Sequence, residues 1–442
     1  MKTSIKVNIF NQTVGYLSQD GSMLSFEYDS DFLNNAIELS PFMLPKTPGI
    51  HKFNNRGNDC FNGLPHFISD ALPDKFGSTI ISAYFAKQGR SIDSITILER
   101  LAFLGKKSIG ALEFEPAFSV LDNSALDDIL NLKVLVDAVK KKIHGELSEV
   151  EDILIETSSG VGGARAKALI GYDKKNKLFK PGQKDVPDGF EHYLIKFDSV
   201  SGDDPKGYGN VEYAYYLMAV DSGIEMTKSF LLPSGDDEHF MTKRFDRVGN
   251  KKIHTQTLCS IIGSDFNRPR SSNYASYFNL ANFFNLGYQA KKEMFRRMVF
   301  NVVLANRDDH TKNFSFLIKE SGEWLLAPAY DITHAYNNTN PNAWTKEHNL
   351  LINNKGTGIT KEDMVTEGIV LSLRDQDMES IIKDVQNVAD NFTFYADKAG
   401  VIGPHKDKII KHLNEVYIDS EPEPEPEPEP PEQHGTKKPT FC

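Results

Sequence analysis

The first 30 residues alternate apolar and polar side chains in the segments SIKVNIF, VGYL and MLSFEYD, with the turn sequence QDGS before the last of them. Alternation with a period of two predicts strands that bury one face, so we expect a small antiparallel sheet at the N-terminus. The stretch GIHKFNNRGNDCFNGLPHFISDALPDKFGS combines Gly, Pro and Asn with aromatic residues. It predicts an ordered, packed loop that leads into a helix at residues 74–88.

The period changes in the middle of the chain. Residues 125–145 carry apolar positions at helical spacing and predict one or two amphipathic helices. The segment ILIETSSGVGGARAKALIGYD predicts a strand, a glycine-rich loop and a second strand. HYLIKFDS predicts a further strand, NVEYAYYLMAVDSGI a helix that ends at Gly223, and KSFLLPSGDDEHFMTKRFDRV two strands around a turn.

Helical spacing dominates after residue 274, in YASYFNLANFF, KKEMFRRMVFNVVLANR, MESIIKDVQNVADNFTFYADKAG and HKDKIIKHLNEVY. A β-rich half therefore precedes a mostly helical half, and the predicted fold class is α+β. The last residues repeat Glu-Pro, which can form neither a helix nor a paired strand. We therefore expect residues 419–442 to be an extended, disordered tail.

Composition and charge argue against several classes of protein. No apolar run approaches the length of a membrane helix, and the N-terminus lacks an apolar signal core, so we expect a cytoplasmic protein. The three cysteines are widely spaced, which excludes a disulfide framework and a cysteine-rich zinc site. The net charge is −11, and six Glu and two Lys of the tail leave −7 for the rest. A broad DNA-binding face is not expected on so acidic a chain.

The segment NRDDHTKNFSF brings four candidate catalytic side chains together between apolar stretches. Phosphoryl transfer from ATP needs a carboxylate near the attacking hydroxyl, oxygen ligands for Mg²⁺ and cations near the phosphates. Asp308 and Asn313 have the five-residue separation of the catalytic loop of protein kinases. Asp331 is predicted to lie at a strand end and to reach the same metal, and Lys312 to neutralise the transferred phosphoryl group. The plainer alternative is a loop with helix caps.

Elements upstream favour the first interpretation. The loop SSGVGGARAK allows backbone N–H groups to approach phosphates. Lys196 lies within a strand, and Glu212 in the next helix could pair with it, as in kinase active sites. Backbone groups from Lys243 to Phe245 could contact an adenine edge. The alternatives are a tight turn, a surface lysine, a surface glutamate and an edge strand. No GK[ST] follows the glycines, so a P-loop NTPase is disfavoured.

The order of glycine-rich loop, strand lysine, helix glutamate, catalytic loop and aspartate is that of a protein-kinase-like phosphotransferase. With FNGLPHFISDALPDKFG, GGARAKALI, HYLIKFD, NVEYAYYLMAVDSGI, KRFDR, NRDDHTKNFSF and APAYDI, the sequence resembles the HipA toxins from about residue 5 to about residue 400. These are bacterial serine/threonine kinases of toxin–antitoxin systems. The resemblance implies a bilobal α+β fold near that of phosphatidylinositol kinases, with a β-rich N-terminal and a mostly helical C-terminal lobe. We expect an N-terminal subdomain at 1–110, the rest of the N-lobe at 111–246 and the C-lobe at 247–418.

The resemblance also assigns roles to single residues. Asp308 would be the catalytic base, with Lys312 beside it, and Asn313 and Asp331 would bind Mg²⁺. The residues that would contact ATP are Gly160, Gly162, Gly163, Ala164, Arg165, Lys167, Lys196, Glu212, Lys243, Phe245 and His310. His310 is expected mainly to support the loop. Asp309 would form a helix-cap bond or hold His310.

One departure from the family concerns self-inhibition. Members carry a serine just before the loop glycine, and its autophosphorylation ejects the loop and silences the kinase. The aligned position is Gly160 in this chain, so the neighbouring Ser158 and Ser159 are the candidates for autophosphorylation. A dianionic phosphate in the loop would repel the phosphates of ATP.

The resemblance implies ATP and Mg²⁺ as cofactors and a protein substrate of translation, such as an aminoacyl-tRNA synthetase, whose phosphorylation arrests growth. It also implies a separate helix-turn-helix antitoxin similar to HipB, which would make most contacts with operator DNA. We find no such domain fused to this chain. Two alternatives stay open. A lipid or small-molecule kinase is disfavoured by the acidic charge, and a non-enzymatic scaffold is disfavoured by the presence of Lys196, Asp308, Asn313 and Asp331 together.

Overall fold

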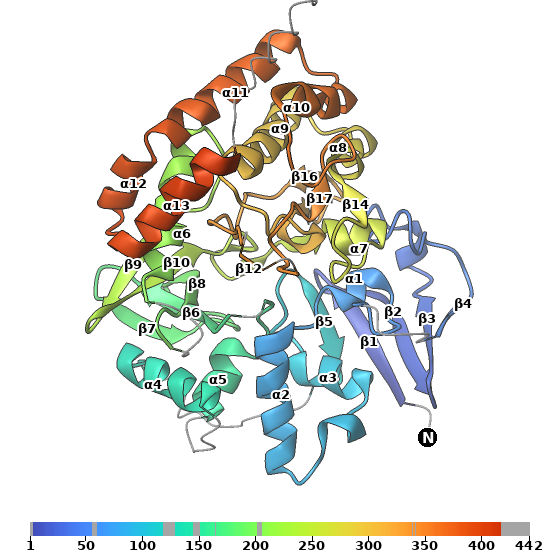
Figure 1. The fold of residues 1–442 in the computed structure, drawn as a ribbon. Coiled ribbons are helices and arrows are strands. Elements are labelled where there is room, and N and C mark those ends of the chain that lie inside the picture. Colours follow the sequence, from blue (N-terminus) through green and yellow to red (C-terminus); the bar gives the residue numbers. More distant parts are fainter. Residues whose placement is uncertain are drawn as a thin grey trace, which may run out of the picture.

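The chain folds into a β-rich N-terminal part and a mostly helical C-terminal part, the bilobal α+β arrangement of a kinase-like fold (Figure 1). The structure is a computed structural model that describes residues 3–54, 60–117, 129–144, 151–163, 165–200, 206–337, 339–340 and 342–416. The predicted Glu-Pro tail with Cys442, and Ala164 of the glycine-rich loop, lie outside these residues. Among the described helices, none is long and apolar enough to cross a membrane.

The predicted N-terminal sheet is confirmed. Its strand order is β4-β3-β2-β1-β5, and all its neighbours are antiparallel. The strands are β1 (Thr3–Ile9), β2 (Gln12–Asp20), β3 (Met23–Tyr28), β4 (Ile50–Asn54) and β5 (Leu112–Glu115). Alternate residues such as Val7, Leu17 and Phe26 are fully buried, which explains the period of two in the sequence. Since β5 pairs with β1, this sheet extends past residue 110, and the division predicted there stays a prediction.

Three helices accompany the first sheet, namely α1 (His66–Ser69), α2 (Lys75–Lys87) and α3 (Ile97–Leu104). The helix expected at residues 74–88 is thus confirmed as α2. Its buried residues include Phe76, Ile80 and Ile81, and these belong to the main hydrophobic core. In Figure 1, α2 stands below the centre of the molecule, close to α3 and α5.

A second five-stranded sheet has the order β7-β6-β8-β10-β9. Its strands are β6 (Lys167–Asp173), β7 (Leu178–Pro181), β8 (Glu191–Lys196), β9 (Ser229–Ser234) and β10 (Asp237–Lys243). Every residue of β6 is buried, as expected of a strand inside the sheet. The helices nearby are α4 (Leu132–Ile143), α5 (Glu151–Ser158) and α6 (Tyr208–Asp221). The predicted helix within residues 125–145, the helix that ends near Gly223 and the two strands around a turn are confirmed.

The strand predicted at ILIETSS is wrong, because these residues lie in helix α5 and the turn after it. Leu154 and Ile155 are buried, and Thr157 Oγ1 donates a hydrogen bond to the carbonyl oxygen of Ile153 at 2.7 Å, one helical turn back. A short apolar run fits a buried strand and a buried helix equally well by periodicity. The glycine-rich loop therefore connects a helix to a strand.

The C-terminal part is built mainly from helices, as predicted. They are α7 (Leu258–Ile262), α8 (Tyr274–Phe283), α9 (Tyr288–Val303), α10 (Lys361–Gly368), α11 (Asp375–Asp390), α12 (Phe392–Lys398) and α13 (Gly403–Val416). Short strands lie among them: β11 (Arg247–Val248), β12 (Lys251–Lys252), β13 (His254–Thr257), β14 (Ser272–Asn273), β15 (Ser315–Ile318), β16 (Trp324–Leu326) and β17 (Leu350–Leu351). β13, β15 and β16 form an antiparallel sheet next to the catalytic loop.

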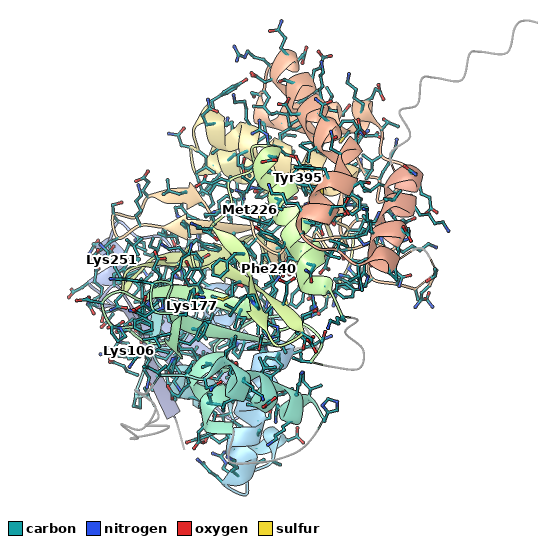
Figure 2. All side chains as sticks on the ribbon, turned by 90° about the vertical axis from the view of Figure 1, so that its left-hand side faces the viewer. Lys106, Lys177, Met226, Phe240, Lys251 and Tyr395 are labelled. Atoms are coloured by element: carbon teal, nitrogen blue, oxygen red, sulfur yellow. The ribbon has the colours of Figure 1, made fainter. Side chains whose placement is uncertain are left out.

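Helix α6 joins the two parts. It packs on β9 and β10 of the second sheet and against α12 of the C-terminal part. The Tyr395 hydroxyl on α12 donates a hydrogen bond to Asp221 Oδ2 at the end of α6, at 2.9 Å. Figure 2 shows Phe240 of the sheet below Tyr395, with Met226 at a height between them. The site described next lies where these two parts meet.

Candidate functional site

Lys196, Glu212 and Asp331 form a buried charged cluster. Lys196 is the last residue of β8 and Glu212 lies on α6. Lys196 Nζ contacts Glu212 Oε1 at 2.5 Å, so the predicted contact between strand lysine and helix glutamate is present. The same ammonium group also binds Asp331 Oδ1. The cluster places one cation between two carboxylates from different elements.

The charged groups of this cluster shift one another's pKa values. Burial acts to lower the pKa of Lys196, but the Asp331 and Glu212 carboxylates outweigh it and raise that pKa. Burial acts to raise the pKa of Asp331, and the Lys196 and Lys167 ammonium groups overcome it and hold that pKa well below its usual range. The pKa of Glu212 is raised, mainly by burial. A lysine kept charged at this position is suited to binding phosphates.

Asp331 lies in irregular backbone five residues after β16, and not at the strand end itself. Its φ is 56°, in the left-handed region that few side chains other than Asn and Asp adopt. The preceding segment is held to the β-rich part, since Ala329 N–H donates to the carbonyl oxygen of Glu225 at 2.8 Å. In this conformation the Asp331 carboxylate reaches Lys196.

The catalytic loop holds Asp308 and Asn313 together. Asn313 Nδ2 donates to the backbone carbonyl oxygen of Asp308 at 2.7 Å, across the predicted five-residue spacing. Burial and the nearby Asp331 carboxylate raise the pKa of Asp308, while His310 and a hydrogen bond from Trp344 lower it. A carboxylate with a raised pKa is a better proton acceptor than an ordinary one.

His310 supports the loop, as expected. Its Nδ1 accepts a hydrogen bond from the Lys312 N–H at 3.2 Å, at the start of the 3₁₀ turn Thr311–Asn313. Its Nε2 lies 3.7 Å from Asp308 Oδ1. Contact with a nucleotide stays a prediction for this residue.

The expectation for Asp309 is wrong. Its carboxylate neither caps a helix nor holds His310. Oδ2 accepts hydrogen bonds from the Tyr274 hydroxyl at 2.9 Å and from His348 Nδ1 at 2.8 Å, and Oδ1 accepts one from Asn349 N–H at 2.7 Å. Asp309 is 1% exposed. The two adjacent aspartates thus differ in environment, because Asp308 faces the site and Asp309 anchors the loop to the C-terminal part.

Trp344 is a site residue that sequence reasoning missed. Its indole Nε1 donates a hydrogen bond to Asp308 Oδ1 at 2.7 Å. Thirty-six residues separate the two, and a tryptophan in the polar segment NNTNPNAWTKEH carries no recognisable spacing. The indole therefore binds the carboxylate oxygen that the attacking hydroxyl of a substrate would need as its acceptor.

The glycine-rich loop is anchored by side chains from other elements. Gly160 N–H donates to Gln183 Oε1 at 2.9 Å, and Gly163 N–H donates to Asp74 Oδ2 at 3.0 Å. Gly163 has φ 93°, a left-handed backbone conformation that favours glycine over any residue with a Cβ. Burial lowers the pKa of Lys167, against the nearby Asp331 carboxylate. The Arg165 guanidinium lies 5.0 Å from the ring centre of Tyr208.

Lys312 reaches toward the glycine-rich loop. Its Nζ pairs with Asp74 Oδ1 at 2.5 Å. Burial acts to lower the pKa of Lys312, but the Asp74 and Asp70 carboxylates outweigh it and raise that pKa. A charged lysine is thereby held at the edge of the site. Its proposed role toward the phosphoryl group stays a prediction.

The predicted adenine hinge lies at the end of β10. Lys243 is paired with Tyr193 of β8, three positions along from Phe240, which pairs with Lys196. The Lys243 side chain binds Glu191 at the far end of β8. The half-buried ring of Phe245 lies 5.6 Å from that of Tyr330, the neighbour of Asp331. The backbone at Lys243 to Phe245 is thus close to the charged cluster, and adenine binding stays a prediction.

Ser158 and Ser159 are completely buried at the end of α5. Ser159 Oγ donates to the carbonyl oxygen of Ile155 at 2.7 Å, and Ser158 Oγ lies 3.2 Å from Thr157 Oγ1. A Cβ added at Gly160 would overlap the carbonyl oxygen of Lys107. The family's serine therefore does not fit at this position in the observed loop conformation. Phosphorylation of either neighbouring serine requires the segment to leave its place.

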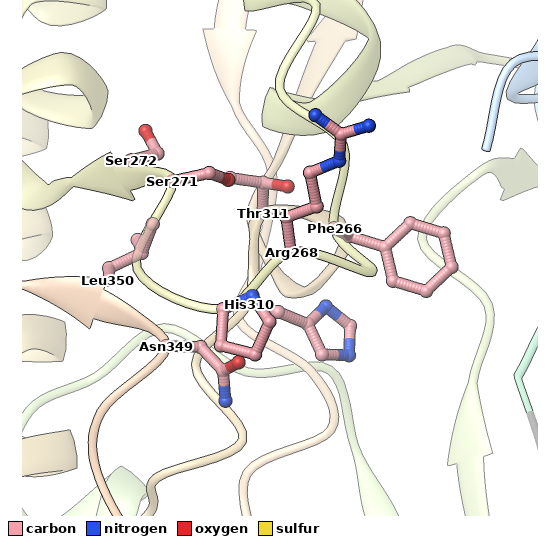
Figure 3. Close-up of a pocket in the computed structure, with 9 residues that line it drawn as sticks. Phe266, Arg268, Ser271, Ser272, His310, Thr311, Asn349 and Leu350 are labelled. Carbon is pink, nitrogen blue, oxygen red and sulfur yellow. The ribbon is translucent and has the colours of Figure 1, made fainter. Parts of the chain in front are cut away.

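A surface pocket adjoins the catalytic loop. Figure 3 shows its lining residues, among them Phe266, Arg268, His310 and Thr311. The ring centres of Phe266 and His310 are 5.5 Å apart. The pocket lies beside His310 and Thr311 of this loop.

The residues expected to bind Mg²⁺ face a common cavity. Asn313 and Asp331 both line it, together with Asp309 and Tyr330. Within the described ranges, no group of three or more His, Cys, Asp or Glu side chains is placed to hold a metal ion by itself. Mg²⁺ needs few protein ligands, because it keeps waters and binds substrate phosphates. Asn313 and Asp331 are of the residue types that bind Mg²⁺, but the buried Arg297 also lines this cavity, and Mg²⁺ binding by the two residues stays a prediction.

Two matches to protein families cover most of the site. Residues 5–115 match the family described as HipA N-terminal domain, and residues 159–392 match the family described as HipA-like C-terminal domain. The second match spans more than half of the chain and includes every predicted residue from Gly160 to Asp331.

Sequence identity to individual relatives is low. The serine/threonine-protein kinase toxin HipA of Shewanella oneidensis is 20% identical over 364 residues, which are 74% of each protein. A Haemophilus influenzae protein, named as a kinase of unconfirmed activity, is 29% identical over 141 residues. That match spans 27% of this chain and only 39% of the relative.

A solved structure shares the fold. A chain in the complex of HipA, HipB and operator DNA from Shewanella oneidensis superposes with a TM-score of 0.65. The superposition covers 93% of this chain and 95% of that one, at 15% sequence identity. At this identity, the likeness establishes the fold and leaves the chemistry to the side chains described above.

Proposed function

Since the chain belongs to the HipA family of protein kinases, we propose that it is an ATP-dependent serine/threonine kinase that acts as the toxin of a toxin–antitoxin pair. It would phosphorylate a protein needed for translation, such as an aminoacyl-tRNA synthetase, and thereby arrest growth. ATP and Mg²⁺ would be its cofactors, and the cytoplasm its place of action.

The observation that carries this proposal is the position of Lys196. The lysine binds a glutamate from α6 and the aspartate that follows the catalytic loop. Kinases need both the lysine–glutamate pair and the metal-binding aspartate in place for activity. β8, α6 and the segment after β16 converge on this arrangement, with Asp331 135 residues from Lys196, and a scaffold without activity has no physical need for it.

The side chains divide the chemistry among themselves. Once Trp344 leaves that carboxylate, Asp308 would accept the proton of the substrate hydroxyl as its oxygen bonds to the terminal phosphorus of ATP, while the bond from that phosphorus to the bridging oxygen breaks and ADP leaves. Lys196 would hold the phosphates in line, and Lys312 would balance charge on the transferred group. Asn313 and Asp331 would hold Mg²⁺, which, when bound, neutralises charge on the phosphates.

Partners follow from the relative whose structure contains HipB and operator DNA. We extend this by proposing a separate helix-turn-helix antitoxin that neutralises the kinase. Without the tail the chain has a charge of −7, so operator DNA would be bound mainly through the antitoxin. Ser158 or Ser159 would be phosphorylated only after the glycine-rich loop leaves its place.

Intact-mass spectrometry with and without MgATP, followed by mapping of the peptide 151–175, tests self-phosphorylation. Growth after induced expression tests the toxin role. We expect arrest by the wild type and none by Asp308→Ala at equal protein level. Arrest by folded Asp308→Ala protein would favour a scaffold and would refute the kinase toxin.

A further inference from the structure

The motif FISDALPDKFG of the N-terminal part has no role in the chemistry proposed so far, yet its carboxylates point at the catalytic region. Asp70 accepts hydrogen bonds from Thr257 N–H at 2.6 Å and from Thr257 Oγ1 at 2.8 Å, at the residue that caps α7. Asp74 lies at the N-cap of α2. The motif therefore connects the first sheet's helices to the C-terminal part.

The Asp74 carboxylate does not cap its own helix. An aspartate at the N-cap usually accepts a hydrogen bond from the first-turn N–H groups, but no such bond is present on α2. Instead, Oδ2 accepts from Gly163 N–H at 3.0 Å and Oδ1 pairs with Lys312 Nζ at 2.5 Å. One carboxylate thus joins the glycine-rich loop and the catalytic loop.

The backbone around Asp74 fixes this geometry. Phe76 N–H donates to the carbonyl oxygen of Gly163 at 3.3 Å. A Cβ added at Gly77 would lie 2.7 Å from the carbonyl oxygen of Val161 and 3.2 Å from that of Ser159, so the first turn of α2 fits directly against the loop. Asp74 is therefore held at the start of a helix that packs on the loop.

We propose that Asp74 is a positioning residue for phosphoryl transfer, which holds Lys312 at the phosphoryl group and closes the glycine-rich loop toward the catalytic loop. This inference rests on the proposed kinase function. It makes the N-terminal part a component of the active site, since one of its side chains holds both the lysine that would face the phosphoryl group and the backbone of the glycine-rich loop.

Two substitutions separate the two contacts. Asp74→Asn keeps an oxygen for Gly163 N–H and loses the ion pair with Lys312. We expect kcat to fall about 100-fold, the loss typical of a misplaced catalytic group, with an unchanged KM for ATP. Asp74→Ala loses both contacts, so KM should rise as well. Lys75→Ala, at the exposed neighbouring residue of α2, serves as the control and should match the wild type.

Non-additivity gives a second readout. If Asp74 acts through Lys312, the double variant Asp74→Asn/Lys312→Met should have the kcat of Lys312→Met alone. Additive losses would overturn the proposal. An unchanged kcat in Asp74→Asn, or a rise, would also overturn it, and a rise would identify the contact as an inhibitory one.

Hydrogen exchange separates this inference from the proposed function. Asp74→Ala should speed amide exchange in the peptide around Gly163, whereas Lys75→Ala should not. Transfer by the wild type with unchanged exchange and kcat in Asp74→Ala refutes the positioning role alone. A wild type that binds ATP and phosphorylates nothing refutes the kinase function, whatever the exchange result.

Discussion

The indole Nε1 of Trp344 donates a hydrogen bond to Asp308 Oδ1 at 2.7 Å. A side chain from a separate segment thus binds the carboxylate oxygen on which the proposed reaction depends. The indole stabilises the charged form of Asp308, and it binds the oxygen that, in the proposed reaction, would accept the proton of a substrate hydroxyl. Both effects can be measured.

Replacing Trp344 with Phe should shift the pH dependence of kcat/KM. Burial raises the pKa of Asp308, and the Trp344 hydrogen bond opposes that rise. Without this donor, the pKa rises further, so the base is deprotonated only at higher pH. The acidic limb of the profile should therefore move to higher pH. Thr345→Ala is the neighbouring control, and an acidic limb that stays in place or moves to lower pH would contradict this role of the indole.

The adjacent aspartates should separate stability from activity. Asp308→Ala is expected to abolish transfer with little change in the free energy of unfolding, since its side chain is 40% exposed. Asp309→Ala leaves the Tyr274 hydroxyl, His348 Nδ1 and Asn349 N–H without an acceptor in a buried place.

We expect Asp309→Ala to lose about 3 to 5 kcal/mol of stability, at about 1 to 3 kcal/mol for each unsatisfied group with partial relaxation. Denaturant unfolding of both variants checks this. Equal stability of the two would show that the hydrogen bonds of Asp309 do not anchor the loop.

Lys196→Met should destabilise the protein in a pH-dependent way. Removing the cation leaves Glu212 and Asp331 facing each other, which costs about 3 to 5 kcal/mol near neutral pH. Burial already raises the pKa of Glu212, and loss of Lys196 raises it further, so acidification neutralises Glu212 in the variant.

In the wild type, acidification instead removes stability. The pKa of Asp331 is depressed, so its contribution is present above the unfolded pKa and is lost as the pH falls through the folded one. The stability difference between wild type and variant should therefore shrink on acidification. Unfolding curves at several pH values measure it, with the exposed Lys175→Met as control. A difference that grows at low pH would exclude this account of the cluster.

Gly160→Ser should loosen the glycine-rich loop. The added Cβ would overlap the carbonyl oxygen of Lys107 and also Gln183 Oε1, the atom to which the Gly160 N–H donates. A loss of about 1 to 3 kcal/mol is expected from such overpacking. Limited proteolysis should then cut near residue 160 faster than in wild type. Gly287→Ser, in open space, should leave both properties unchanged.

Much of the fold was predictable because apolar residues recur at regular spacing along the strands and helices of this chain. The contact between Lys196 and Glu212 was predictable because kinase chemistry needs a strand lysine paired with a helix glutamate, and the roles of the other site residues stay predictions. The strand predicted at ILIETSS was wrong, because tertiary packing decides whether a short apolar run is a strand or a helix.

Asp74 and Trp344 escaped sequence reasoning for another reason. Asp74 lies 238 residues from Lys312, and Trp344 is joined to Asp308 across a turn of irregular backbone. The spacing of residues within one segment predicts neither the Asp74–Lys312 contact nor the Trp344–Asp308 contact. Asp309 was misassigned because its three donors come from α8 and from the segment before β17, which the neighbouring sequence does not reveal.

The most direct test of the central claim is transfer of labelled γ-phosphate from MgATP to proteins of a bacterial lysate, by wild type, Asp308→Ala and Asp331→Ala. The account predicts a labelled serine- or threonine-phosphorylated protein with the wild type and none with either variant, while both variants stay folded. Equal labelling by the wild type and by Asp308→Ala, or no labelling by wild-type protein that binds ATP, would contradict it.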